Sequence, residues 1–282
     1  MIHGDEGWLG WCSSVEGARA AAEAAMQAGA TGVIVHAGEP ASVVRVDGLG
    51  DPDGWAQRCD VALHRTATRH VLRHVRRWPL GDVTPGVTML FSIHRKPGMS
   101  VHDFHAWWER SHAPVALRHH VGMWDYAQVS VVQTIHGTPW DGFAVTQCPT
   151  LDDLMHRFSS GPEGTAALRD DAAQFTDATT LQRALMDEAV LVETAWPASG
   201  VVPVGAARSA PCAVDGPLAV DDLPDGVSVE VRPTAEGGHR LDVLWRSVVD
   251  VAEVDALPGR FDVAWSRLAA AAGVDPQLSS NS

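Results

Sequence analysis

Residues 86–120 constrain the fold of this chain most strongly, because they read as a strand that leads through a tight break into a helix. Apolar and polar residues alternate from Val87 to His94, which is the period of a half-buried strand. A Lys-Pro-Gly sequence at 96–98 ends that strand. Ser100 then stands where a helix N-cap is expected, and Asp103 lies in the first turn, where its charge suits the helix dipole. The segment predicts a strand followed directly by a helix.

Pro114 lies inside this expected helix. Proline lacks a backbone N–H, and its ring crowds the carbonyl group four residues earlier. The residue before it, Ala113, is also disfavoured in helical angles. We therefore expect a kink at which the imidazole of His112 leaves the helix surface and points into a cavity. The alternative is that His112 only caps the broken helix.

The motifs in and after this segment carry a resemblance to a known family. A strand is followed by Arg-Lys-Pro-Gly, a serine, and a helix containing Trp-Trp-Glu-Arg-Ser-His-Ala-Pro; Trp-Asp-Tyr-Ala-Gln at 124–128 and Asp-Gly-Phe at 141–143 come next. This order, over about residues 86–195, resembles the EthD family. The resemblance implies a ferredoxin-like unit of the dimeric α/β-barrel superfamily. Members of that family include dehydratases and decarboxylases that act on aromatic polyketides.

The first 84 residues show the beginning of the same element order. Strands are expected at 8–12, 31–36, 41–47 and 59–65, and an alanine-rich helix at 15–28. Residues 70–78 are expected to hold the second helix, although they also fit a strand. The predicted fold class is therefore α+β: tandem ferredoxin-like βαββαβ units that form a dimeric-α/β-barrel-type architecture within one chain.

Three domains are expected from these patterns. They are a degenerate N-terminal ferredoxin-like unit at 1–84, an EthD-like unit at 85–196, and a small C-terminal α+β extension at 197–282. Within the extension, residues 206–225 read as a linker rich in proline, glycine and aspartate. Residues 227–232 and 240–250 read as a hairpin turning at Glu236-Gly-Gly, and residues 261–272 as an amphipathic helix.

His112 is the main candidate for chemistry, because a histidine can act as base and acid near neutral pH. Tyr126, the only tyrosine in the chain, is expected to donate a hydrogen bond to a developing enolate oxygen; an ordinary core position is the alternative. Asp141 is expected to orient His112, unless it serves only a turn. The side chains expected to bind substrate in the same cavity are Trp108, Phe91, His94, Gln128 and Phe143.

The amino-acid composition limits the classes of molecule that we expect this chain to bind. The chain has 35 acidic and 21 basic residues and a formal charge of −14, which disfavours nucleic acid and anionic membranes. With no apolar run of bilayer length and no secretion signal, a cytoplasmic protein is expected. Its four cysteines are scattered and contain no Cys-x-x-Cys, so they are expected to be reduced structural thiols rather than a zinc ribbon or a redox pair.

The sequence therefore favours a cofactor-independent lyase or cyclase that acts on an aromatic, polyketide-like small molecule. It contains no nucleotide-binding or metalloprotease motif. Two alternatives are a haem-binding barrel enzyme, since related barrels hold haem through a histidine, and a non-catalytic ligand-binding barrel. A homodimer is possible under each of these hypotheses.

Overall fold

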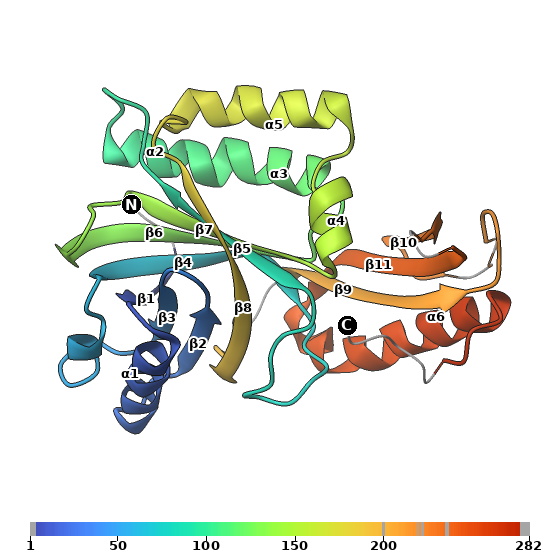
Figure 1. Ribbon diagram of the computed structural model, residues 1–282, viewed down its shortest axis with the longest axis horizontal. Coiled ribbons are helices and arrows are strands. Elements are labelled where there is room, and N and C mark those ends of the chain that lie inside the picture. Colours follow the sequence, from blue (N-terminus) through green and yellow to red (C-terminus); the bar gives the residue numbers. More distant parts are fainter. Residues whose placement is uncertain (1–3, 199–200, 219, 221–222, 235–236, 277–282) are drawn as a thin grey trace. The chain divides into compact units, whose positions relative to one another are not determined.

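The computed structural model describes residues 4–198, 201–218, 220, 223–234 and 237–276 (Figure 1). The chain folds into two compact units: one comprises the residues up to Val71 together with Trp78–Trp196, and the other comprises Leu72–Arg77 together with the residues from Pro197. None of the described helices has the length and apolarity that crossing a bilayer requires.

The first repeat of the larger unit follows a βαβββ order. Its elements are β1 (Asp5–Cys12), α1 (Val15–Gln27), β2 (Gly32–Ala37), β3 (Ser42–Asp47), the 3₁₀ helix η1 (Ala56–Arg58) and β4 (Ala62–His74). Of the two alternatives for residues 70–78, the strand holds as far as His74, where β4 ends, and the helix is wrong. A single 3₁₀ turn, η1, stands where a second helix would precede the last strand.

The second repeat has the full βαββαβ order. Its elements are β5 (Val87–Ile93), α2 (Val101–Trp107), the π-helix η2 (Trp108–His112), α3 (Ala113–His119), β6 (Asp125–His136), β7 (Gly142–Cys148), α4 (Leu151–His156), α5 (Pro162–Phe175) and β8 (Gln182–Val192). The Ser100 side chain caps α2 by accepting from the Asp103 backbone N–H. Helices α2, α3 and α5 run over one face of β5, β6 and β7 (Figure 1).

The two repeats close one ring of strands. The strand order is β1-β3-β2-β8-β5-β7-β6-β4, and β4 also pairs with β1. Each repeat therefore contributes four strands in the ferredoxin-like arrangement, and β2–β8 and β6–β4 join the repeats. The expected α+β fold of ferredoxin-like repeats is confirmed. The expected boundary at 84/85 falls inside one compact unit.

The inside of this ring is an apolar core. Strand side chains alternate between the ring interior and the helix layer. Those facing inward form a cluster whose members include Leu9, Val43, Leu90, Val129 and Phe143. The outward face of β5–β7 is left to pack against helices, which is where the site described below lies.

The smaller unit is a three-stranded antiparallel sheet with a helix. It contains β9 (Val201–Cys212), β10 (Val227–Pro233), β11 (His239–Asp250), η3 (Val251–Ala256) and α6 (Leu257–Ala271). The expected hairpin is the pairing of β10 with β11; Glu236 of its turn lies outside the described residues. The expected linker at 206–225 is wrong over its first part, because β9 pairs with β11 as far as Cys212.

Candidate active site

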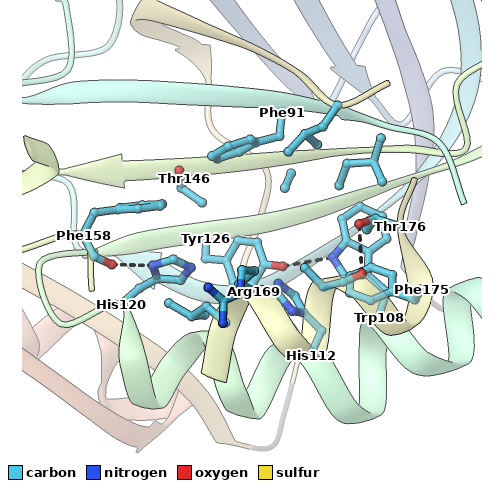
Figure 2. A pocket seen from close by; sticks show the side chains of 15 residues that line it. Phe91, Trp108, His112, His120, Tyr126, Thr146, Phe158, Arg169, Phe175 and Thr176 are labelled. Carbon is cyan, nitrogen blue, oxygen red and sulfur yellow. Dashed lines mark hydrogen bonds between the residues drawn. The ribbon is translucent and has the colours of Figure 1, made fainter. Parts of the chain in front are cut away.

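A cavity of about 240 Å³ lies between the sheet of the second repeat and its helices (Figure 2). Its walls come from strands β5, β6 and β7 and from helices η2, α3 and α5. The lining side chains are mainly aromatic and apolar, and they include Phe91, Trp108, Tyr126, Phe158 and Phe175, with His112 and Arg169 among the few polar ones. Such a site suits a flat ligand held by apolar contact and oriented by few polar groups.

His112 is held in this wall by a carboxylate. Its Nδ1 lies 2.6 Å from Oδ2 of Asp171 on α5, and both side chains are mostly buried. The other carboxylate oxygen of Asp171 accepts a hydrogen bond of 3.1 Å from Trp107 Nε1. Because Asp171 accepts at Nδ1, the proton of the neutral imidazole resides there and Nε2 is the basic nitrogen.

A π turn explains why Trp107 and His112 reach the same carboxylate. In a regular α-helix, residues five apart point roughly 140° away from each other. In η2 the Ala113 N–H instead bonds to the carbonyl of Trp108, five residues earlier, and this wider turn brings side chains five apart onto one face.

The chain stays helical through Pro114. Ala113 keeps helical angles (φ −57°, ψ −45°), so the expectation that it leaves them is wrong. The wider turn absorbs the proline instead. The Glu109 carbonyl would bond to the nitrogen five residues on, which is that of Pro114 and carries no hydrogen. Arg69 of β4 approaches this carbonyl with Nη1 at 3.4 Å.

Tyr126 is surrounded by donors. Its hydroxyl oxygen accepts from Trp108 Nε1 at 3.1 Å (Figure 2) and from Gln128 Nε2 at 3.1 Å. The Gln128 carbonyl oxygen in turn accepts from Arg69 Nη1 at 3.1 Å, which fixes the amide with its NH₂ group toward the tyrosine. Burial raises the pKa of Tyr126 to about 12. The phenol therefore keeps its proton, and with both acceptor positions occupied that proton is available to a ligand in the cavity.

Glycine makes room for the indole of Trp108. A Cβ atom at Gly142 of β7 would lie 2.4 Å from the Trp108 ring, which is too close for any side chain. Trp108 is almost completely buried. The Asp-Gly-Phe motif thus has a direct packing role at the floor of the cavity, which sequence reasoning did not assign to Gly142.

Two of the predicted site residues lie elsewhere. Asp141 accepts from the backbone N–H of Arg95 at 2.9 Å and pairs with the Arg95 guanidinium. His94 stacks on Trp140 with ring centroids 4.2 Å apart. Both line a second, more open hollow beside the loop after β5. Asp171 therefore replaces Asp141 as the carboxylate on His112.

Two other predicted residues are near the cavity without lining it. Gln128 is buried behind Tyr126 and Trp108 and takes part through its hydrogen bonds. Phe143 points into the ring interior, where it packs 6.1 Å from the Trp11 ring. The structure brings His112, Tyr126, Trp108 and Phe91 together in the cavity, as expected from the sequence. Asp171 and Arg69 were missed, because neither stands close in sequence to the residues it contacts.

The cavity does not fit haem. Its volume is below the roughly 300 Å³ at which pockets for drug-sized ligands begin, and a porphyrin with four pyrrole rings is larger than such a ligand. Among the described residues, no group of three or more His, Cys, Asp or Glu side chains is arranged to hold a metal ion.

The ring of two ferredoxin-like repeats, with a helix-covered cavity in one of them, places the larger unit in the dimeric α/β-barrel fold. The family comparison is more specific. The EthD domain model matches residues 96–179, which contain the π turn, His112, Tyr126 and Asp171; this chain contains an EthD domain. No curated protein and no solved structure matches the chain.

Proposed function

We propose that this protein is a cofactor-independent lyase or cyclase that moves a proton on a small aromatic, polyketide-like ketone. The observation that carries the proposal is a histidine base and a tyrosine donor in the walls of one aromatic cavity. Acid–base catalysis of this kind contributes typically 10²- to 10⁴-fold to a rate.

His112 is the base in the proposed reaction. Its Nε2 takes a proton from the carbon next to a ligand carbonyl, and the electron pair of that C–H bond moves to form an enolate. Asp171 accepts from Nδ1–H, so it orients the ring and stabilises the imidazolium that results. The imidazolium then returns its proton to a departing hydroxyl, which leaves as water, or to a carbon atom in an isomerisation or ring closure.

Tyr126 is the donor to the enolate oxygen. Its two acceptor positions are taken by Trp108 and Gln128, so its own O–H is directed to a third partner. A donor that is already oriented before reaction stabilises developing charge without reorganisation. Arg69 is a positioning residue in this scheme, since it acts on the tyrosine through Gln128.

The size of the cavity limits the substrate. A volume of about 240 Å³ suits one or two fused rings. The rings of Phe91 and Phe158 lie nearly parallel, 6.3 Å apart, and offer flat apolar surfaces to such a ligand. Arg169, which pairs with Asp170 at 3.1 Å, also lines the cavity and offers a cation to a phenolate or carboxylate substituent.

The test uses 2-tetralone, a two-ring aromatic ketone with acidic protons beside its carbonyl. In deuterated buffer, NMR follows replacement of those protons. We expect the wild-type protein to accelerate the exchange, and His112→Ala to lose the acceleration while its circular dichroism spectrum is unchanged. Equal exchange by wild type and His112→Ala would refute His112 as the base.

The same experiment distinguishes the ligand-binding alternative. Quenching of tryptophan fluorescence reports binding of 2-tetralone, because Trp108 lies in the wall of the cavity. The experiment is repeated with other aromatic ketones of one and two rings. If they bind saturably and none exchanges its protons faster, the protein is a ligand-binding barrel and the enzymatic proposal is wrong.

A further inference from the structure

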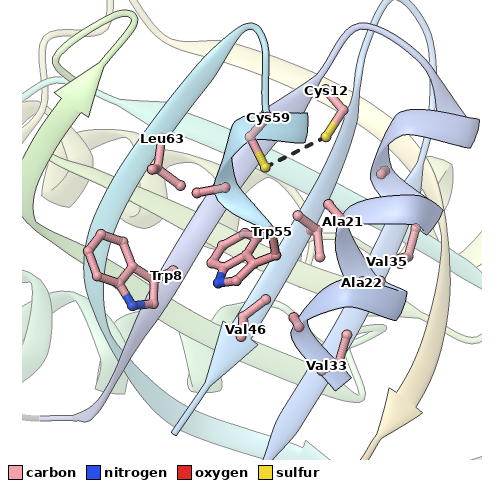
Figure 3. Packing of buried hydrophobic residues seen from close by; sticks show 14 residues of the cluster. Trp8, Cys12, Ala21, Ala22, Val33, Val35, Val46, Trp55, Cys59 and Leu63 are labelled. Carbon is pink, nitrogen blue, oxygen red and sulfur yellow. Dashed lines mark hydrogen bonds between the residues drawn. The ribbon is translucent and has the colours of Figure 1, made fainter. Parts of the chain in front are cut away.

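Two thiols lie against each other in the first repeat, away from the cavity (Figure 3). The Sγ atoms of Cys12, at the end of β1, and Cys59, just after η1, are 3.8 Å apart. Both side chains are buried, at 0% and 1% exposure, and both cysteines are reduced. A disulfide requires the sulfurs to approach to about 2.05 Å, which is a movement of less than 2 Å.

The backbone around the pair is already held in place for this bond. The next residues along each segment, Ser13 and Asp60, are joined by two hydrogen bonds: the Ser13 backbone N–H to Asp60 Oδ1 at 2.8 Å and the Ser13 hydroxyl to Asp60 Oδ2 at 2.5 Å. One residue before Asp60, the thiol of Cys59 occupies space left by Gly10, where a Cβ atom would lie 2.2 Å from the sulfur. The two thiols thus face each other across segments that are joined by hydrogen bonds one residue further along.

The hydrogen bond between the thiols shifts their two pKa values in opposite directions. The hydrogen bond with Cys59 lowers the pKa of Cys12, against the opposing effects of burial and of the Asp60 charge. The hydrogen bond with Cys12, together with burial, raises the pKa of Cys59. The thiolate is the nucleophile in sulfur chemistry, and these directions favour Cys12 as the attacking sulfur; attack by either thiol gives the same disulfide.

We propose that Cys12 and Cys59 form an oxidation site that a small peroxide converts into an intramolecular disulfide. Hydrogen peroxide is uncharged and close to water in size, which suits a buried pair. The Cys12 thiolate attacks one peroxide oxygen, the O–O bond breaks, and sulfenic acid and hydroxide form. The Cys59 sulfur then attacks the Cys12 sulfur, the S–O bond breaks, and the hydroxyl leaves as water with the Cys59 proton. In total, two thiols and one peroxide give one disulfide and two waters.

The disulfide links positions 47 residues apart in the chain, so it removes entropy from the unfolded state of the first repeat. From that loop length we expect the melting temperature to rise by roughly 5–10 °C on oxidation. A thiol reductant should reverse the change.

The test treats the full-length, reduced protein with hydrogen peroxide, blocks remaining thiols after unfolding, and maps peptides by mass spectrometry. We expect a cross-linked pair of peptides containing Cys12 and Cys59, lighter by two hydrogen atoms than the separate peptides, and the rise in melting temperature. Cys12→Ser and Cys59→Ser should show neither. A variant with Cys148→Ser and Cys212→Ser, which retains only the pair, should oxidise as the wild type does.

The same peptide map can overturn the proposal. The proposal fails if peroxide has oxidised Cys148 and Cys212 while Cys12 and Cys59 are still recovered as blocked thiols. It also fails if Cys12 and Cys59 are recovered as separate sulfinic acids. This outcome is read from the wild type and from the variant that retains only Cys12 and Cys59. The test can therefore still be made if Cys12→Ser fails to fold.

Discussion

Trp107 and His112 bond to opposite oxygens of one carboxylate, that of Asp171. The π turn between them makes this possible, and it places the imidazole of His112 in the wall of the cavity. π turns recur at functional sites because they change which side chains share a face of a helix. Here the turn also accommodates Pro114 inside a continuous helix.

Substitution of Asp171 by Asn should reduce kcat strongly while the fold persists. The amide keeps the size of the carboxylate but loses its charge and favours the wrong imidazole tautomer. A loss of roughly 10²- to 10⁴-fold is expected, by analogy with other histidine–aspartate pairs. Exchange of 2-tetralone protons measures it. The matched control is Glu163→Gln, because that exposed acidic residue lies in the first turn of the same helix and does not line the cavity; equal rates for both variants would show that Asp171 has no positioning role.

Tyr126 can be titrated alone, since the chain has no other tyrosine. Burial raises its pKa to about 12, so tyrosinate absorbance should appear roughly two pH units higher in the native protein than in urea. Because the folded pKa is the higher one, the unfolded state loses its proton first. Stability from this group is therefore complete below about pH 10 and declines as the pH rises to about 12. A native midpoint near pH 10 would contradict the hydrogen-bonded, buried position, and Tyr126→Phe should abolish the signal.

Gly142→Ala should disturb the floor of the cavity. The added methyl group overlaps the Trp108 ring, so we expect a loss of about 1–3 kcal/mol in the free energy of unfolding and weaker binding of 2-tetralone. Urea denaturation followed by tryptophan fluorescence measures the first effect. Gly50→Ala is the control, because a Cβ atom there meets no atom within 4 Å. If both variants are as stable as wild type, the tight contact at Gly142 is wrong.

His36 should make the fold sensitive to acid. Burial, and next the charge of Arg45, lower the pKa of this ring to about 3. The unfolded chain binds a proton near pH 6.5 and the folded chain does not, so stability is complete above pH 6.5 and declines as the pH falls toward 3. His36→Gln should flatten the dependence of the unfolding free energy on pH between 6.5 and 4. His102→Gln, at a side chain that is 73% exposed, should leave the slope as in wild type.

The sequence predicted the second repeat well because its signals are local. Alternation located β5 and β6, and Ser100 located the start of α2. Alternation could not tell which face of β7 bears the site, because every residue of that strand is buried. One face of β7 lines the ring interior and the other meets helices, so Phe143 and Ala144 look equivalent in sequence and only the second lines the cavity.

Local sequence patterns could not identify Asp171 as the hydrogen-bond partner of His112. Asp171 lies 59 residues further along the chain, and its approach depends on a π turn whose hydrogen bonds leave no distinct pattern of residue types. The prediction of a helix at residues 70–74 failed for a related reason. Their alternation and their helical spacing are equally good, and the strand continues because Arg73 and His74 pair with β9.

Arg69 belongs to the first repeat, yet it contacts Gln128 and the Glu109 carbonyl in the second. An excised EthD domain would lack this guanidinium, however well it folded. The first repeat, whose described residues form no second α-helix, therefore supplies the cation that holds the Gln128 amide beside Tyr126. We expect natural variants at position 69 to change in step with those at position 128.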